Sequence, residues 1–261
     1  DPAKKGARKD GLDLTQAWLD RYHNSGAVVY DAKGFAAIDP ANVDHLLGLF
    51  NRSHMEYEAD RAKDKAGEPS LTEMTVKAID ILAKNPKGYV LMVEGGRIDH
   101  AHHDGNAFRA LTDTVAFDQA IKAALDKVDL QETLVVVTAD HSHTFNIAGY
   151  PQRDNPILGV SKFDGKVVLA ADGKPYTTLT YANGPGAAKG EREDLTTVDT
   201  EASNYKQQSL VPMSSETHGG EDVGIFAAGP WAHLFQGVVD QPYIFVVMNY
   251  ATGLNGQLAM K

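Results

Sequence analysis

Acidic residues and histidines gather in three short segments of this chain, each beside an apolar run. Residues 93–103 read VEGGRIDHAHH, residues 138–143 read TADHSH, and residues 216–222 read ETHGGED. Carboxylate oxygens and imidazole nitrogens are the ligands that Zn²⁺ takes, alone or in sites shared with Mg²⁺. Because sites with several metal ions mostly handle phosphoryl groups or hydrolysis, the three segments predict a metal-dependent hydrolytic centre.

The first segment has a spacing that suits a single ion. Asp99 and His103 are four residues apart, and on a helix this spacing places both side chains on one face. Glu94 precedes them by one short loop, where Gly95 and Gly96 provide a flexible turn. We therefore expect the three side chains to lie near one another.

The residues of the other two segments can reach a common metal ion only if the fold brings them there. Asp140 and His141 are consecutive, so their side chains diverge unless the backbone has left the strand and turned. His218 lies far away in sequence and would have to return over the edge of the sheet. Taken singly, an acid at the end of a strand is more often a hydrogen-bonded cap for the next helix than a metal ligand. The coincidence of three such clusters favours a metal site.

Composition narrows the classes of partner. The formal net charge of -10 argues against a nucleic-acid backbone as a specific partner, which needs a basic patch. A small phosphorylated substrate stays compatible, because bound metal ions can dominate the local field. The chain has no cysteine, so thiolate ligands and disulfides are absent. No run of about 18 apolar residues occurs, and no membrane span is expected.

The elements that must position these residues alternate between helix and strand. The predicted helices cover 14–22, 41–50, 70–83, 103–128 and, at the end, 243–251; the predicted strands cover 27–30, 88–94, 133–139 and 223–227. Ser70 and Glu73 have the spacing of a capping box. This alternation predicts an α/β fold with a parallel sheet, in which ligands bind beyond the carboxyl ends of the strands.

Composition changes after about residue 149. Residues 150–215 are rich in Gly, Pro, Asp, Thr and Ser, and Asp172 with Gly173 is a good hairpin turn. We interpret 150–215 as an inserted subdomain of short strands and loops. Residues 1–149 and 216–261 would then form the metal-binding core.

All three acid and histidine segments closely resemble the metal motifs of alkaline phosphatases, and the likeness extends from about residue 11 to about residue 250. His100 stands where the enteric bacterial enzymes carry lysine, so the sequence of the motifs resembles the animal-type branch of the family more closely. The resemblance implies a three-layer αβα sandwich with a central, mostly parallel sheet. Segment 150–215 would match the crown-like subdomain that sits at the dimer interface of that family.

The resemblance also implies an activity and a set of ligands. The activity is hydrolysis of small phosphate monoesters through a phosphoserine, by a periplasmic or extracellular homodimer that holds two Zn²⁺ and one Mg²⁺. His143 would orient a ligand from outside the coordination sphere, and His100 would lie close to the bound phosphate and the Mg²⁺. The implied ligands are Glu94 for Mg²⁺, Asp99, His103 and His218 for the first Zn²⁺, and Asp140 and His141 for the second.

Two departures from the family pattern matter. The Asp-Ser-Ala motif of the family's nucleophile is absent from these 261 residues. We therefore expect the serine to lie outside this chain, in a missing N-terminal portion, and residues 1–261 alone to be inactive and poorly folded. At the peripheral calcium site of animal enzymes, Phe50 and Glu68 match, but Asn51 replaces an acid, which argues against calcium.

Two alternatives stay open at this point. One is a related metalloenzyme of the same superfamily, such as a phosphodiesterase, a cofactor-independent mutase or a sulfatase. These enzymes share the pairing of Asp with His at the metals but not the wording of segment 93–103. The other is a non-catalytic, metal-binding fragment that serves in assembly, which the missing nucleophile favours.

Overall fold

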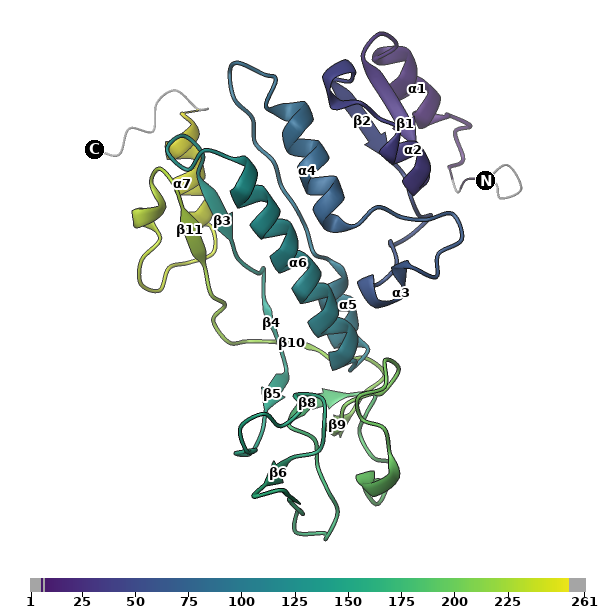
Figure 1. Cartoon of the computed structure of the whole chain (residues 1–261), viewed down its shortest axis with the longest axis vertical. Helices are drawn as coiled ribbons and strands as arrows, with labels where there is room; N and C mark the ends of the chain where they lie inside the picture. The colour runs from purple at the N-terminus through teal and green to yellow at the C-terminus, as the bar shows by residue number, and fades with distance from the viewer. Residues whose placement is uncertain (1–5, 7, 254–261) are drawn as a thin grey trace. The chain divides into compact units, whose positions relative to one another are not determined.

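The computed structural model describes Gly6 and residues 8–253, which divide into two compact units (Figure 1). Among these residues, the first unit comprises Gly6, 8–56 and 60–93, and the second comprises 57–59 and 94–253. A short helix, α3 (Glu58–Arg61), spans one of the three points where the chain passes from one unit to the other. None of the helices within residues 8–253 has the length and apolar content that crossing a membrane requires.

The first unit is built around a two-stranded parallel sheet. Strand β1 (Gly26–Val29) pairs with β2 (His45–Gly48). Helix α1 (Leu14–Arg21) precedes β1 and begins where the Asp13 carboxylate accepts hydrogen bonds from two free backbone N–H groups of its first turn. The predicted helix at 14–22 and strand at 27–30 are confirmed within a residue or two at each end. Helix α2 (Ala32–Ala36) and the 3-10 turn η1 (Pro40–Asn42) follow β1.

The predicted helix over 41–50 is wrong, because this stretch contains η1 and then β2. Asp39 caps only the short 3-10 turn, and Val43 is already in an extended conformation. An apolar run of four or five residues cannot be assigned to helix or strand by periodicity alone. Here the hydrogen-bond partners offered by β1 decide in favour of a strand.

Helix α4 (Leu71–Leu82) confirms the predicted helix at 70–83 together with its capping box. Ser70 Oγ accepts from the Glu73 N–H at 3.2 Å, and the Glu73 carboxylate accepts from the Ser70 N–H at 2.7 Å. Two N–H groups that no helical carbonyl can reach are thereby satisfied. The Lys77 ammonium donates to the Phe35 carbonyl at 2.6 Å and so ties α4 to α2 within the first unit.

The predicted strand at 88–94 is not formed. These residues are neither helix nor strand, and no strand in the described part of the chain pairs with them. Val90 and Met92 are 56% and 83% exposed, so one side of this apolar run faces solvent. An apolar composition suits a buried strand, but a strand also needs hydrogen-bonding neighbours, and here it has none.

In the second unit, the helix predicted over 103–128 is confirmed as α6 (Ala107–Lys127), which begins four residues later than predicted. A separate short helix, α5 (Arg97–His103), precedes it closely in Figure 1. Gly105 interrupts them with a left-handed φ of +64°, which favours glycine. Asn106 then caps α6, its side-chain oxygen accepting from the Arg109 N–H at 2.9 Å. The break leaves Asp99 and His103 on a helix of their own.

Two stretches of the second unit run antiparallel to each other through two short ladders. Strand β3 (Val135–Val137) pairs with β11 (Phe226–Ala228), and β4 (Ser142–His143) pairs with β10 (His218–Gly219). Between the ladders, residues 138–141 on one side face the longer stretch 220–225 on the other, so the pairing is interrupted there. The predicted strands at 133–139 and 223–227 are confirmed as shorter elements, although they pair with each other in antiparallel fashion.

The rest of the second unit consists of short strands and turns before a closing helix. The remaining elements are β5 (Phe145–Ile147), β6 (Lys162–Phe163), β7 (Lys166–Val167), β8 (Leu179–Gly184), η2 (Leu195–Thr197), β9 (Ser209–Pro212), η3 (Ala232–Leu234) and α7 (Tyr243–Thr252). Strand β8 lies between β5, antiparallel, and β9, parallel. Helix α7 confirms the prediction for 243–251. Asp172 and Gly173 form the predicted turn, in which Gly173 has a φ of +77°.

The second unit includes residues 150–215 along with the elements that flank them. The division of the chain into a core of 1–149 and 216–261 and an insertion of 150–215 therefore stays a prediction. For the candidate site, the relevant parts of the second unit are α5, β4 and β10.

Candidate metal centre

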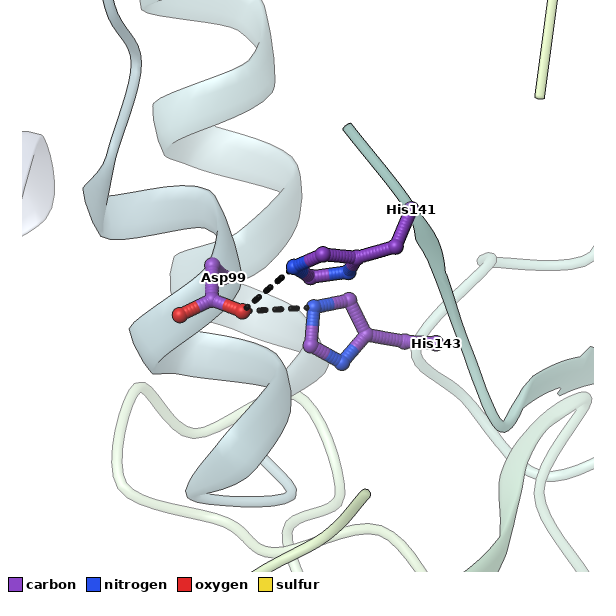
Figure 2. A group of neighbouring side chains, drawn as sticks. All are labelled: Asp99, His141 and His143. Atoms are coloured by element: carbon purple, nitrogen blue, oxygen red, sulfur yellow. Dashed lines mark ion pairs between the residues drawn. The ribbon is translucent and has the colours of Figure 1, made fainter. Parts of the chain in front are cut away.

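The Asp99 carboxylate, on the first turn of α5, lies at the centre of a group of four histidines. Its Oδ1 atom is 3.0 Å from His143 Nε2, 3.3 Å from His103 Nε2, 3.4 Å from His218 Nε2 and 3.7 Å from His141 Nε2. Figure 2 shows Asp99 with His141 and His143, whose rings point their Nε2 atoms at the same oxygen. The residues come from all three acid and histidine segments of the sequence.

Helix α5 and the β10 region together orient His103. The i to i+4 spacing on α5 places its ring beside Asp99, as predicted. Its Nδ1 lies 2.6 Å from the carbonyl oxygen of Glu216, which only a protonated nitrogen can approach as a donor. The Nε2 of neutral His103 is therefore unprotonated and presents its lone pair to the cluster.

The ladder between β4 and β10 brings the other two segments together. In its register His218 lies directly opposite His143, and Gly219 lies opposite Ser142. A side chain at Gly219 would run into the carbonyl oxygen of His143 at 2.8 Å, so the close approach of the two strands needs glycine here. His141, in the interrupted stretch next to the ladder, stacks on His218 with ring centroids 3.5 Å apart.

Three residues of this cluster have the separations of ligands to one ion. The ligand atoms of a tetrahedral zinc site, with bonds of about 2.1 Å, are about 3.4 Å apart. The Asp99 oxygen lies 3.3 Å from His103 Nε2 and 3.4 Å from His218 Nε2, and the two Nε2 atoms are 3.2 Å apart. Asp99 Oδ1 is buried and accepts no hydrogen bond from any described residue. A buried oxygen that faces the unprotonated Nε2 of His103 in this way fits a cation between the two atoms.

A second possible ligand group shares the same carboxylate. Asp99, His141 and His143 also present one ligand atom each, all within 4.8 Å of one another. His143 Nε2 is buried without a hydrogen-bond partner, as Asp99 Oδ1 is. The sequence analysis placed His143 outside the coordination sphere, whereas its Nε2 atom, 3.0 Å from Asp99 Oδ1, is closer to that oxygen than the Nε2 atoms of the other three histidines.

The structure does not bring Asp140 and Glu94 into these groups. The Asp140 side chain is 82% exposed, and its Oδ2 atom lies 3.5 Å from the Nε2 atom of the adjacent His141. Glu94 is exposed, and its carboxylate lies beside Gly96 at the start of α5. Their roles as ligands to the second Zn²⁺ and to Mg²⁺ stay predictions.

His100 is also on α5, three residues before His103, and has a basic neighbour. The Arg97 guanidinium approaches its Nδ1 at 3.1 Å. Because guanidinium only donates hydrogen bonds, Nδ1 must accept, and the ring proton of neutral His100 is on Nε2. Arg97 in turn stacks over the Tyr57 ring, with its central carbon 3.6 Å from the ring centroid. His100 is thus held in one tautomer beside a fixed positive charge.

Sequence reasoning missed three residues that lie against the cluster. His102 stacks on His143 with ring centroids 4.6 Å apart, and its Nδ1 is 2.8 Å from the Tyr181 hydroxyl. Burial lowers the pKa of His102 to about 4, so its ring is neutral at pH 7, and burial raises the pKa of Tyr181. The third is Glu216, whose side chain is fully buried. His102 and Glu216 lie in two of the acid and histidine segments, but only the fold reveals that they are buried. Nothing in the sequence around Tyr181 indicates that it lies near the site.

These features define a candidate metal-binding site in a protein of the α/β class, with one carboxylate shared among histidines from separate parts of the chain. The alkaline phosphatase family matches residues 1–254. The tissue-nonspecific alkaline phosphatase of Homo sapiens is 46% identical over 263 residues, covering 99% of this chain and 49% of the human protein. The alkaline phosphatase of Gadus morhua is 46% identical, covering 96% of this chain and 52% of the cod protein.

A solved structure agrees with these relatives. The alkaline phosphatase of Thermus thermophilus superposes with a TM-score of 0.63 at 26% identity, covering 95% of this chain and 59% of that one. The chain belongs to the alkaline phosphatase family and has an alkaline phosphatase-like α/β fold, as its motifs predicted. It spans about half the length of the curated relatives it matches.

Proposed function

We propose that the whole protein, meaning the natural polypeptide that contains these residues, hydrolyses phosphate monoesters with metal ions held by this chain. Membership of the alkaline phosphatase family supports the reaction class. The observation that carries the proposal is the buried Asp99 oxygen with four imidazole nitrogens 3.0–3.7 Å away. Such a group is costly to maintain without a cation, because the Asp99 Oδ1 and His143 Nε2 atoms are buried and have no hydrogen-bond partner among the described residues.

We assign the first Zn²⁺ to Asp99, His103 and His218. Three protein ligands leave one coordination position open, which is the pattern of catalytic rather than structural zinc sites. When bound, such ions stabilise the negative charge on the attacking and departing oxygens and lower the pKa of a bound hydroxyl or water. The task of these residues is to fix the ion: α5 supplies two of them and β10 supplies the third.

We assign the second Zn²⁺ to Asp140 and His141, and the Mg²⁺ to Glu94. His141 is stacked on His218 and directed at Asp99, which supports a second ion next to the first. The Glu94 carboxylate is the oxygen donor that Mg²⁺ prefers, and its exposure leaves room for the several waters that Mg²⁺ retains. Calcium is not part of the proposal, since the Asn51 amide donates to Glu68 at 3.3 Å where an acid would be needed.

His100 would contact the phosphate. Its Nε2 carries the ring proton, because Nδ1 accepts from Arg97. A protonated Nε2 is a donor suited to a phosphate oxygen, and the nearby guanidinium adds positive charge. His100 would therefore bind and orient the substrate.

The nucleophile would come from elsewhere in the whole protein. None of the serines in this chain lies in an Asp-Ser-Ala motif. Ser142, next to His141, donates its hydroxyl to Glu221 at 2.7 Å, which engages its proton away from Asp99. We further propose, from the family resemblance, that the whole protein is a homodimer and acts in the periplasm or outside the cell.

The test is a substrate panel on the whole protein with controlled metals. We expect turnover of a chromogenic phosphate monoester that is lost after chelation and restored by Zn²⁺ with Mg²⁺. Under the same conditions a phosphate diester and a sulfate ester should react at least a hundredfold more slowly. Faster turnover of either ester would move the protein to another enzyme of the superfamily. Stoichiometric zinc without any turnover would favour a non-catalytic metal-binding role.

A further inference from the structure

Glu216 lies against the histidine cluster, and its side chain is fully buried. We propose that Glu216 is a positioning residue, which holds His143 with its carboxylate and His103 with its main-chain carbonyl so that both rings face the metal. The inference rests on the proposed function, because it takes a metal ion to bind at this cluster. No role for Glu216 follows from the ligand assignments above.

The hydrogen bonds that the Glu216 carboxylate accepts come from two residues of the β4 region, His143 and Thr144. Its Oε2 atom is 2.8 Å from His143 Nδ1. Its Oε1 atom accepts from the Thr144 N–H at 2.6 Å and from the Thr144 hydroxyl at 2.7 Å. Both oxygens are thus committed, and the plane of the carboxylate is fixed by β4 itself.

The main chain of Glu216 holds His103 in the same way. The Glu216 carbonyl accepts from His103 Nδ1 at 2.6 Å, and the Glu216 N–H donates to the His103 carbonyl at 2.9 Å. Glu216 therefore accepts a hydrogen bond from the Nδ1–H group of each of two histidines, which come from different segments. It lies two positions before His218, so the same turn also delivers a third ring.

These hydrogen bonds determine which ring nitrogens are available. Protonated Nδ1 atoms leave Nε2 of neutral His103 and His143 as lone-pair donors. Those two Nε2 atoms are the ones that lie 3.3 Å and 3.0 Å from Asp99 Oδ1. An acid that accepts from the far nitrogen of a metal-ligating histidine fixes its tautomer and orientation and raises its basicity.

The burial of Glu216 also calls for a compensating positive charge. A carboxylate removed from water is costly unless it is paired. Among the described residues its ion-pair partners are His103 and His143, which are charged only when protonated. A cation bound on the far side of both rings satisfies this requirement while the rings stay neutral. Glu216 is therefore suited to act on the metal through the two histidines.

Glu216→Gln in the whole protein tests the role, with Glu221→Gln as the matched control. The amide has one oxygen and one NH₂, so it cannot accept from both His143 and Thr144 as the carboxylate does. Glu221 lies in the same segment and also accepts a side-chain hydrogen bond, from Ser142, but is exposed. Both variants lose one negative charge near the centre. Zinc affinity is measured by competition with a chromogenic chelator, and ligand geometry by the visible spectrum of the Co²⁺-substituted protein.

We expect Glu216→Gln to weaken zinc binding by about 10- to 100-fold and to shift the Co²⁺ bands. Glu221→Gln should change the affinity by less than about threefold, a small effect typical of exposed charges, and leave the spectrum unchanged. Equal zinc affinity and equal spectra for Glu216→Gln and the unmodified protein would overturn the inference. If the unmodified protein itself bound no zinc, the proposed function would fail instead.

A milder variant covers the case in which Glu216→Gln does not fold, as judged by circular dichroism. Thr144→Val removes the hydroxyl that donates to Oε1 but keeps the Thr144 N–H and the carboxylate. We expect a folded protein whose Co²⁺ spectrum is shifted and whose zinc affinity is about 3- to 10-fold lower, a loss below the range for removing the acid itself. An unchanged spectrum with unchanged affinity in this variant would contradict the positioning role.

Discussion

Substituting alanine for Gly219 tests whether the approach of β10 to β4 builds the metal centre. An added Cβ would meet the His143 carbonyl oxygen at 2.8 Å and would also overlap Ser142 Oγ and Glu221 Oε2. The two side chains can rotate away, but the carbonyl belongs to the paired strand, so β10 must retreat from β4. Because His218 directly precedes Gly219, its ring moves with the strand.

Overpacking of this kind costs about 1–3 kcal/mol. If the strands separate to relieve the overpacking, the binding of zinc becomes weaker by the same free energy. Since 1.4 kcal/mol corresponds to a factor of ten, the zinc affinity then drops by about 5- to 150-fold. If instead the ladder holds, the same cost appears as a lower free energy of unfolding of the zinc-loaded protein. The loss of zinc-binding free energy and the loss of unfolding free energy should together add up to the cost of overpacking.

Gly220→Ala is the matched control, since a Cβ there has no heavy atom within 4 Å. Both variants are made in the whole protein and compared by chelator competition for zinc and by denaturant unfolding of the zinc-loaded form. We expect Gly220→Ala to behave like the unmodified protein in both assays. If Gly219→Ala did so as well, the argument that the ladder sets the ligand positions would be refuted.

Three further outcomes are expected from other parts of the structure. His218→Ala should remove about one zinc per chain by elemental analysis and slow turnover without a change in circular dichroism, because its side chain is 49% exposed; unchanged zinc content would contradict the assignment. Ser70→Ala should lower the free energy of unfolding by about 1 kcal/mol, since it removes the N-cap of α4; a loss below about 0.3 kcal/mol would show that the cap is dispensable. Gly105→Ala should cost about 1–2 kcal/mol, because φ is +64° and a Cβ there meets only Pro185 at an ordinary 3.4 Å; an unchanged midpoint of thermal unfolding would mean that the turn relaxes.

Local signals in the sequence predicted several elements correctly. The capping box at Ser70 and Glu73 fixed the start of α4, because both partners lie within one turn of the chain. The segments 41–50 and 88–94 were misassigned for a different reason. Each is a short apolar run whose conformation depends on whether another strand lies beside it, and that is a property of the fold.

In the candidate site, too, local contacts could be predicted from the sequence and distant contacts could not be predicted from local rules. The pairing of Asp99 with His103 follows from helix geometry, and the structure brings the two together. The arrival of His218 from 115 residues away was predicted from the coincidence of three acid and histidine segments and from the family motif, since no local rule joins distant segments. Glu216 escaped notice because an acid in a glycine-rich turn is usually solvated, and its burial could not be read from its neighbours in sequence.

The ladder that joins β4 to β10 is only two residues long on each strand, so by itself it holds the two strands together weakly. An ion held by His103 and His218 would act as a cross-link that closes the loop of chain between them. By analogy with a disulfide, a cross-link closing a loop of about 100 residues stabilises a protein by about 4–5 kcal/mol at most, through the freedom it removes from the unfolded chain. Depleting the ion would therefore free residues 104–217 to open and expose them to proteases. The supply of metal would then govern how long each molecule survives as well as how fast it works.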